Sequence, residues 1–368
     1  MKLGQLMSMD GKDVLPPELV ELLAPLRDSA HVMPLSQLVG VLEAEYGVGW
    51  EGRFQRFGFN PVAAASIGQV HRAETRDGRV VAIKVQYPGV RESIDSDIAN
   101  LALLFRLLGP LADDVDLGPT LEEARLQLHR EADYRAEARS LGEYRELLTD
   151  DPDLTVPAVH SDLSGSRLLA MDFAEGVPVD VLVSRAETRA VRDRVAEILS
   201  RLALRELFEL RLMQTDPNFS NYLYDAARGR IALLDFGAAR RVDPFLAESY
   251  RALARAAMAE SRDGVREAAL AMGYLAADDT PGHAQGLVDL ILMATEPLRH
   301  RGPYDFAMSD LFGRAHALGH DLVFRRGFKR TPPPETMFLH RKFVGTFLLC
   351  ARLRARIDLR ALVAPWLD

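Results

Sequence analysis

Three short elements of this chain carry residue types that suit phosphate chemistry. Lys84 ends the apolar run Val80–Ile83. Further along, Asp216 and Asn221 stand five positions apart, and Asp235 opens the tripeptide Asp-Phe-Gly. A lysine ammonium can hold phosphate oxygens, and carboxylate and amide oxygens are ligands that suit Mg²⁺. We therefore expect a site for a phosphate-bearing nucleotide and a divalent cation.

The order of these elements is more specific than any one of them. The chain runs from V-A-I-K through D-x-x-x-x-N to D-F-G. This order is typical of the catalytic apparatus of a protein-kinase-like fold. In that apparatus Lys84 would hold the α- and β-phosphates, and Asp216 would face the acceptor group or water. Asn221 and Asp235 would bind Mg²⁺ between the phosphate oxygens of ATP or ADP.

The length, charge and cysteine content of the chain limit the classes of protein to which it can belong. The chain has 368 residues, 48% of them apolar, which suits one large bilobal unit or two domains. A net charge of −8 gives no reason to expect a nucleic-acid partner. The single cysteine, Cys350, excludes a disulfide framework and is expected to be a buried thiol in a reducing compartment. Without a signal-peptide pattern or an apolar run of about 20 residues, we expect a cytoplasmic protein, or one bound peripherally to the inner face of the membrane.

The apolar periodicity predicts the order of the structural elements. We expect helical hairpins over 1–60, with one helix that begins at Pro34 and ends at Gly47. Asp77-Gly78 would turn a β-hairpin. The other expected elements are hairpin strands over 69–75 and 79–86, a helix over 93–108, a long charged helix over 121–148, a strand over 166–173, and a helical region after 180 that contains a short hairpin of 222–224 with 230–234.

This order predicts an α+β, bilobal protein-kinase-like fold with an N-terminal helical extension. We expect the extension over 1–60, a β-rich N-lobe over 61–175 and a helical C-lobe over 176–368. The segment Glu175–Pro178, which ends the strand predicted over 166–173, would be the hinge between the lobes.

Two segments are candidates for the loop that covers the phosphates. Residues 47–52 match G-x-G-x-x-G, but they follow a predicted helix and lie far before Lys84, so Gly47 is better explained as a helix C-cap. Residues 63–70, A-A-A-S-I-G-Q-V, directly precede the hairpin. Because alanine resists positive φ, we expect an altered phosphate cradle and unusual nucleotide selectivity. An ordinary alanine-rich turn is the alternative.

Lys84 needs an anionic partner, because an unpaired charge at the end of an apolar strand would be costly. Its best partner is Glu137, on the long helix predicted over 121–148. Asp133 and Glu137 would share a face of this helix, with Glu131 on another face. Solvated carboxylates on a charged helix, and a lysine at a strand edge, are the alternatives.

The sequence disfavours typical protein-kinase activity. Gln214-Thr215 stands where protein kinases have His-Arg, and only a short segment separates Gly237 from the helix expected near Phe245. There is no room for a long activation segment that docks a peptide. The basic run Leu339–Phe343 could be a membrane or partner face, although a solvated helix face is the preferred interpretation.

Taken together, these residues resemble the UbiB/ADCK family of atypical kinases, also called the ABC1 family, and within it the Coq8-like group. The resemblance rests on stretches spread over nearly the whole chain: KLGQ (2–5), PVAAASIGQVH (61–71), VAIKVQYPGV (81–90), EADYRAEA (131–138), QTDPNFSN (214–221) and LLDFGAAR (233–240). Many members have HxDPHPGN where this chain has QTDPNFSN, a variant that looks like the Coq8-like group. Members usually carry further sequence upstream of KxGQ, so a longer natural chain is an alternative.

The resemblance implies roles for further residues. Lys2 and Gln5 would belong to a KxGQ segment that folds over the active site, and Lys84–Glu137 would be the ion pair between the third strand and the C-helix. Glu131 and Asp133 would form a pair of carboxylates near the nucleotide. The implied nucleotide-binding set is completed by Ala63, Ala64, Ala65, Ser66, Ile67, Gly68 and Val70 over the phosphates, and by Ala82, Asp172, Phe173 and Ala174 around the adenine.

The leading hypothesis is a Mg²⁺-dependent ATPase or small-molecule kinase that supports ubiquinone, or other isoprenoid quinone, biosynthesis at a membrane surface. Expected partners are adenine nucleotides, peripheral membrane lipids, and quinone precursors or quinone-biosynthesis enzymes. A second hypothesis is a nucleotide-gated scaffold or lipid-handling protein that binds ADP or ATP without required turnover. A third, an antibiotic kinase of the aminoglycoside type, shares the fold but explains neither KxGQ nor the alanine-rich loop.

Overall fold

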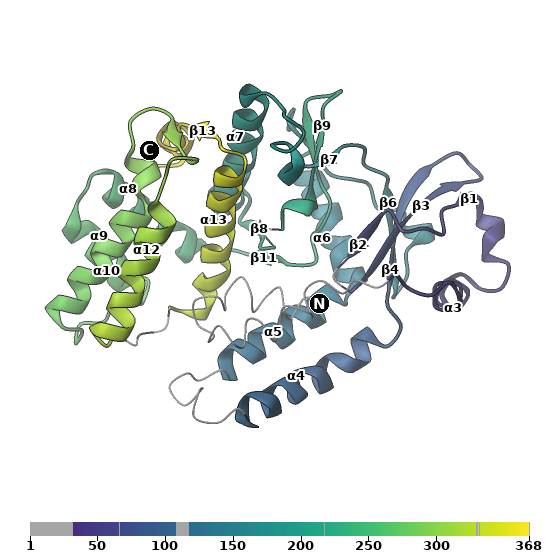
Figure 1. Ribbon diagram of the computed structural model, residues 1–368, viewed down its shortest axis with the longest axis horizontal. Coiled ribbons are helices and arrows are strands. Elements are labelled where there is room, and N and C mark those ends of the chain that lie inside the picture. Colours follow the sequence, from purple (N-terminus) through teal and green to yellow (C-terminus); the bar gives the residue numbers. More distant parts are fainter. Residues whose placement is uncertain are drawn as a thin grey trace. The chain divides into compact units, whose positions relative to one another are not determined.

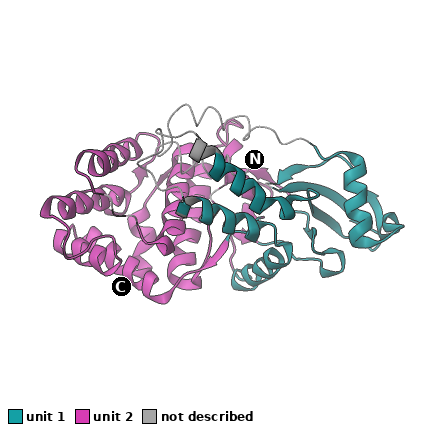
Figure 2. Ribbon diagram, turned by 90° about the horizontal axis from the view of Figure 1, so that it is seen from below, with its two compact units in different colours: residues 1–150, 156–174, 235–238 teal, residues 151–155, 175–234, 239–368 magenta. Residues whose placement is uncertain are grey.

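The computed structural model describes residues 32–65, 67–107, 118–216, 218–328, 330 and 332–367. Two compact units are distinguished in Figure 2. Unit 1 consists of the described residues up to Asp150 together with 156–174 and 235–238, and unit 2 of 151–155, 175–234 and the described residues from 239 onward. The part of the expected helical extension up to residue 31, which includes the KxGQ residues Lys2 and Gln5, lies outside the described residues. The three-part domain division therefore stays a prediction.

A five-stranded sheet forms the centre of unit 1 (Figure 1). Its path is β1-β3-β4-β6, and β2 pairs with β3 off this path. The predicted hairpin is confirmed, because β3 and β4 pair antiparallel around the turn at Gly78, where φ is 87°. The strands are β1 (Phe54–Phe57), β2 (Ala63–Ala65), β3 (Gly68–Thr75), β4 (Val80–Gln86) and β6 (Leu168–Asp172).

Helix α3 (Leu35–Tyr46) shares the hydrophobic core of this sheet. Its buried face is Leu38, Val41 and Leu42, spaced three and four residues apart as a helix facing a core requires. The helix ends at Gly47, whose φ of 87° suits a residue without a Cβ. The G-x-G-x-x-G match is thus a helix end, as expected, and it continues into the short 3-10 helix η1 (Trp50–Arg53).

The expectation of helices throughout 1–60 is wrong for β1. Phe54–Phe57 pairs antiparallel with β3, and the rings of Phe54 and Phe57 pack edge-on against Trp50. Four residues are too few to show a period in the sequence. Cross-strand pairing and this aromatic cluster, both tertiary interactions, decide the conformation.

The single helix predicted over 121–148 is also wrong, because the chain breaks at Ala132-Asp133. Asp133 accepts a hydrogen bond from the backbone N–H of Ala136 and so caps the second helix. Gln86, at the end of β4, donates to the carbonyl of Ala132 at 3.1 Å. The other helices of unit 1 are α4 (Val90–Leu107), α5 (Gly118–Glu131) and α6 (Tyr134–Leu147), together with the 3-10 helix η3 (Ser161–Leu163).

Unit 2 is mainly helical, as the sequence predicts. Its helices are α7 (Arg189–Arg205), α8 (Pro244–Met258), α9 (Arg262–Ala271), α10 (Pro281–Ala294), α11 (Glu296–Arg299), α12 (Leu311–His320), α13 (Pro334–Arg352) and α14 (Leu359–Val363). Short 3-10 or π-helical turns are η4 (Val179–Val181), η5 (Glu206–Leu210), η6 (Phe219–Asn221), η7 (Asp321–Arg325) and η8 (Ala364–Trp366). Cys350 is buried in α13, as expected.

Small sheets accompany the helices of unit 2. The predicted hairpin is confirmed as β9 pairing with β10, and it extends into the order β5-β10-β9-β7. Strand β11 pairs with β8, and β12 with β13. The strands are β5 (Leu154–Thr155), β7 (Val177–Pro178), β8 (Leu212–Gln214), β9 (Tyr222–Asp225), β10 (Arg230–Leu233), β11 (Ala239–Arg241), β12 (Tyr304–Asp305) and β13 (Arg356–Ile357). Among the described helices, none is long and apolar enough to cross a membrane.

Candidate functional site

Lys84 lies on β4 inside unit 1 and faces two carboxylates. Its Nζ is 2.5 Å from Oε1 of Glu137 and 3.3 Å from Oδ2 of Asp235. The side chains of Lys84 and Glu137 are only 9% and 3% exposed, whereas that of Asp235 is 24% exposed. Three residues that are far apart in the sequence therefore meet at one point, with the aspartate nearest to solvent.

Helix α6 holds the Asp-Phe-Gly segment in place. Glu137 accepts a hydrogen bond from the backbone of Phe236. The Phe236 ring packs on Tyr144 of α6 with 4.5 Å between centroids. Asp235 also accepts from the backbone N–H of Gly237 at 3.0 Å, which closes a tight turn. Strand β4, helix α6 and this turn thus form one connected cluster.

The electrostatics of the pair keep Lys84 charged. Burial by itself lowers the pKa of Lys84, but the negative charges of Asp235 and Glu137 outweigh burial and raise this pKa above its ordinary value. Burial raises the pKa of Glu137 to about 7, against the opposing charge of Lys84. The ionised glutamate is costly to bury and depends on the lysine beside it.

A small pocket opens beside this cluster, within unit 1. It encloses about 240 Å³ of empty space, part of which is open solvent. One ammonium and three carboxyl groups line it, so its walls carry more negative than positive charge. The lining residues are Ala65, Ile67, Lys84, Glu131, Tyr134, Glu137, Asp235 and Gly237.

The alanine-rich segment is a strand and not the open loop expected. Ala63–Ala65 forms β2 and pairs with β3, with Ala63 opposite Val70 and Ala65 opposite Gly68. Alanine suits this extended backbone, so the resistance of alanine to positive φ does not arise here. Gly68 is required for a different reason: a Cβ at this position would collide with the carbonyl oxygen of Val85. Ile67 is buried, and Ser66 lies outside the described residues.

Glu131 and Asp133 do not lie on one continuous helix. The expectation that they occupy different faces of a single helix over 121–148 is therefore wrong. Glu131 is the last residue of α5; it is buried, lines the pocket and accepts from Gln127 at 3.2 Å. Asp133 uses its carboxylate as the N-cap of α6, with Oδ1 at 3.0 Å from the N–H of Ala136. The helix break gives the two carboxylates different surroundings.

The residues expected around the adenine lie at the paired edges of β4 and β6. Ala82 is opposite Met171, and Phe173 donates its backbone N–H to the carbonyl of Val80 at 3.0 Å. The carboxylate of Asp172 accepts from the backbone of Ala158 and lies 2.9 Å from Nε2 of His160. Ala174 follows directly as the last residue of this part of unit 1. These contacts fix the backbone of 172–174, whose role toward a base stays a prediction.

Asp216 and Asn221 lie together in unit 2. The amide nitrogen of Asn221 donates to Oδ2 of Asp216 at 3.2 Å, and the backbone N–H of Asn218 donates to Oδ1 at 3.3 Å. The 3-10 turn η6 ends at Asn221 and sets this spacing. Since the hydrogen bond uses the nitrogen of Asn221, its oxygen is the atom that a cation would bind.

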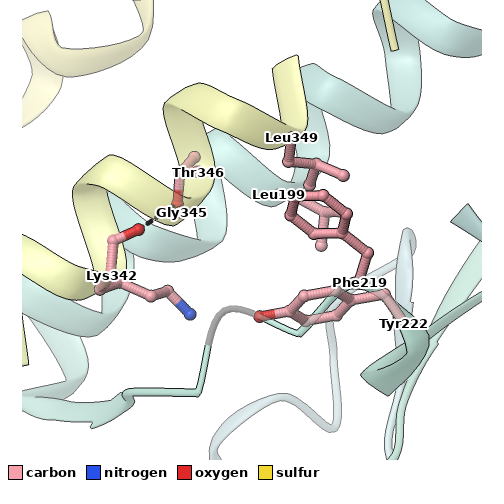
Figure 3. A pocket seen from close by; sticks show the side chains of 7 residues that line it. All are labelled: Leu199, Phe219, Tyr222, Lys342, Gly345, Thr346 and Leu349. Atoms are coloured by element: carbon pink, nitrogen blue, oxygen red, sulfur yellow. Dashed lines mark hydrogen bonds between the residues drawn. The ribbon is translucent and has the colours of Figure 1, made fainter. Parts of the chain in front are cut away.

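A second cluster of polar side chains lies next to the loop of Asp216 and Asn221 in unit 2. The sequence did not indicate this cluster. Lys342 of α13 is 3% exposed, and its Nζ is 2.7 Å from Oε2 of Glu206. Glu206 accepts from the backbone of Gln214 at 3.2 Å, and the Tyr222 hydroxyl donates to the side chain of Gln214 at 3.3 Å. Figure 3 shows the amine of Lys342 and the hydroxyl of Tyr222 pointing toward one another.

The preferred interpretation of Leu339–Phe343 as a solvated face is therefore wrong. Leu339 and Lys342 are buried, and His340 lies 2.8 Å from the Tyr274 hydroxyl. His340, Arg341 and Lys342 are consecutive and have apolar residues on both sides in the sequence, a pattern that also suits a helix packed on several sides. Only the partner Glu206, more than a hundred residues away, shows why Lys342 can be buried.

The fold and the lysine–glutamate pair define a kinase-like protein. A family model described as the ABC1 atypical kinase-like domain matches residues 25–269, so the chain belongs to this family. The family resemblance and the α+β kinase-like fold expected from the sequence are thereby confirmed.

Among curated proteins, the chain is similar to atypical kinases of the COQ8 group. It is 39% identical to the mitochondrial atypical kinase COQ8B of Rattus norvegicus over 362 residues, which cover 98% of this chain and 68% of that protein. It is 38% identical to the mitochondrial atypical kinase COQ8 of Saccharomyces cerevisiae, over 97% of this chain and 71% of that protein. The expectation of an atypical kinase is confirmed at the level of the family.

A solved structure has a similar fold. It is the complex of Rv3197 with erythromycin from Mycobacterium tuberculosis, with a TM-score of 0.69 and 25% sequence identity. The match covers 98% of this chain and 90% of that one. The likeness in fold is therefore not confined to one of the two units.

Proposed function

We propose that this chain is a Mg²⁺-dependent ATPase or small-molecule kinase that supports ubiquinone, or another isoprenoid quinone, biosynthesis at a membrane surface. The observation that carries the proposal is the cluster of Lys84, Glu137 and Asp235 in unit 1. A protein kinase needs both the lysine–glutamate pair and the Asp-Phe-Gly aspartate in place for phosphoryl transfer. Membership of an atypical kinase family supports the same reaction class.

In this proposal Lys84 binds the α- and β-phosphates. Its raised pKa keeps the ammonium charged, and the 2.5 Å contact with Glu137 fixes its direction. A preorganised cation in a partly water-excluded site stabilises charge that develops on the phosphoryl oxygens. Glu137 has no direct contact with the reacting atoms and acts as a positioning residue.

The residues present fit a magnesium ion that is held jointly with a nucleotide. Mg²⁺ commonly binds one or two carboxylates and takes its other ligands from phosphates and water. No group of three or more metal-ligating side chains converges within the described parts of the chain. Asp235 is partly exposed and lines the pocket, as such an ion requires, and Asn221 is the second protein ligand in this proposal. The bound ion would neutralise the charge of the phosphate oxygens.

Asp216 is proposed to orient the attacking water or acceptor hydroxyl. Its hydrogen bonds to Asn221 and to the backbone of Asn218 hold the carboxylate in a defined direction within unit 2. An Asp216→Asn variant should keep the shape of the loop and lose the proton acceptor. We expect turnover to fall by about 100-fold or more, with nucleotide affinity retained.

The remaining roles follow from the family resemblance. We propose that the segment Ala63–Gly68, with Val70, covers the phosphates, and that the adenine lies near Ala82 and the backbone of 172–174. Glu131 and Asp133 would lie near the nucleotide. Lys2 and Gln5 would close over the active site.

A small acceptor is favoured over a peptide. After Gly237 the chain forms the short strand β11 (Ala239–Arg241) and then enters α8 at Pro244, capped by Asp243. A segment this short cannot form the long activation loop on which protein kinases dock a peptide. Peripheral contact with lipid at the inner face of a membrane, and with quinone precursors or quinone-biosynthesis enzymes, belongs to the same proposal.

The decisive experiment is phosphate release from Mg²⁺-ATP by the purified chain, with and without anionic phospholipid vesicles. Asp235→Asn is the test variant. Asp243→Asn is a matched control, because asparagine caps a helix as well as aspartate does. Lipid-stimulated release that only Asp235→Asn loses would support the proposal.

Absence of release, with nucleotide binding intact, would instead favour the nucleotide-gated scaffold. Absence of nucleotide binding by the wild-type chain would contradict both functions.

A further inference from the structure

Tyr134 presents a buried hydroxyl to the pocket of unit 1. The residue is 2% exposed and lines the pocket together with Lys84, Glu131 and Asp235. Among the residues that the structure describes, the Tyr134 hydroxyl has no hydrogen-bond partner. Leaving a buried hydroxyl unsatisfied is unfavourable, and most buried polar groups in native proteins are paired. This hydroxyl therefore requires an explanation.

The break between α5 and α6 determines where Tyr134 lies. Tyr134 is the first residue of α6, directly after the N-cap Asp133. Gln86 holds the carbonyl of Ala132 at 3.1 Å, so the end of β4 fixes the break. Tyr134 is thereby tied on one side to the strand that carries Lys84 and on the other to the helix that carries Glu137.

The surroundings of the hydroxyl suit a donor that meets an anionic ligand. Burial raises the pKa of Tyr134 above its ordinary value, so the phenol is protonated and can donate. Lys84 is also a donor, and both side chains line the same small space. Glu131, Glu137 and Asp235 can only accept when ionised, yet none of them bonds the hydroxyl. Two donors that line one cavity match the oxygens of a phosphate group.

We propose that Tyr134 contacts the bound nucleotide and that its hydroxyl donates a hydrogen bond to a phosphate oxygen beside the ammonium of Lys84. This assignment rests on the proposed function, since it requires a nucleotide in the pocket. The tyrosine hydroxyl is a neutral hydrogen-bond donor beside the lysine, and it contributes affinity for the nucleotide without adding charge. Hydrogen bonds to charged groups are among the stronger ones in proteins.

The test variant is Tyr134→Phe, which removes one oxygen and keeps the ring. The dissociation constants of Mg²⁺-ATP and Mg²⁺-ADP should rise about 10-fold, the loss typical of a hydrogen bond to a charged group. The Tm of the protein without nucleotide should stay the same or rise, because an unsatisfied buried hydroxyl is removed. A hydroxyl with a purely structural role would give the opposite pattern, a lower Tm with unchanged affinity.

The matched control is Tyr46→Phe, also in unit 1. The Tyr46 hydroxyl donates to the carbonyl of Leu163 at 2.6 Å, so this variant should lower the Tm and leave nucleotide affinity unchanged. Dissociation constants for Tyr134→Phe within twofold of wild type, or an equal rise in both variants, would overturn the assignment. If the wild-type chain itself bound neither nucleotide, the proposed function would fail as well, so the two failures are distinguishable.

Discussion

Lys84 and Glu137 form a 2.5 Å ion pair that joins the central sheet of unit 1 to helix α6. Both side chains are nearly removed from solvent. A charge in such a place depends on its partner, because neither water nor another ion can replace it at low cost. The pair is therefore expected to matter for stability as well as for nucleotide binding.

Replacing Lys84 by methionine should destabilise unit 1 by about 3–5 kcal/mol, because Glu137 would stay buried without its partner. The double variant Lys84→Met/Glu137→Leu should recover at least half of this loss. The measurement is urea denaturation followed by Trp50 fluorescence in a Trp366→Phe background. Trp50 belongs to the core of unit 1, so its signal reports on that unit. A loss below about 1 kcal/mol in the single variant would show that Glu137 takes up a proton without penalty.

Two substitutions separate the capping role of Asp133 from its proposed role near the nucleotide. Asp133→Ala should lose about 1 kcal/mol, since the N–H of Ala136 would have no side-chain acceptor. Asp133→Ser should keep the cap and most of the stability while it removes the charge. Reduced ATP turnover in both variants indicates a role near the nucleotide, whereas a defect in the alanine variant alone indicates capping only.

A control for this comparison is Thr188→Ala, which removes the equivalent cap of α7 in unit 2. It should lower stability by a similar amount without a change in nucleotide affinity. Thermal unfolding and ATP binding of the three variants are the required measurements.

The hydroxyl of Tyr222 should support the loop that carries Asp216. It bonds the side chain of Gln214 and lies within hydrogen-bond reach of Lys342. Tyr222→Phe is expected to lower kcat several-fold and stability by about 1 kcal/mol, with little change in nucleotide affinity. The control Tyr250→Phe removes a hydroxyl that bonds Tyr274 in the same unit, and kcat should not change. Equal kcat values for both variants would contradict a positioning role for Tyr222.

His340 should make unit 2 sensitive to acid. Burial lowers the pKa of His340 from 6.5 to about 4. Between these values the unfolded chain binds a proton that the folded chain does not, so the stabilising contribution is present above pH 6.5 and is lost as the pH falls toward 4. The full size of this contribution is about 3 kcal/mol.

The variant His340→Gln tests this expectation, since glutamine does not titrate. The difference in unfolding free energy between wild type and variant should change by roughly 2 kcal/mol between pH 7 and pH 4.5. Parallel curves for the two proteins would show that the pKa of His340 is the same in the folded and the unfolded state. Trp366, which packs near Phe208, is the fluorescent probe for unit 2.

The hairpin of β3 and β4 and the helix α3 could be predicted from the sequence, because each depends on local signals. Asp77-Gly78 specifies a tight turn, and the apolar residues of α3 recur at helical spacing. The motifs around Lys84, Asp216 and Asp235 identified the family for the same reason, since each is a short run with a fixed order. The family and the kinase-like fold could therefore be predicted from these short motifs.

The break at Ala132-Asp133, the strand β1 and the burial of Lys342 could not be predicted from local signals. Gln86 bonds the carbonyl of Ala132, β3 pairs with β1, and Glu206 neutralises Lys342. Gln86 and Glu206 lie dozens of residues or more from the groups that they contact. None of the three partners produces a periodic pattern in the sequence. The sequence determined the residue types available for phosphate chemistry. The tertiary structure decided which of them meet, because only folding brings Lys84, Glu137, Asp235 and the hydroxyl of Tyr134 around one pocket.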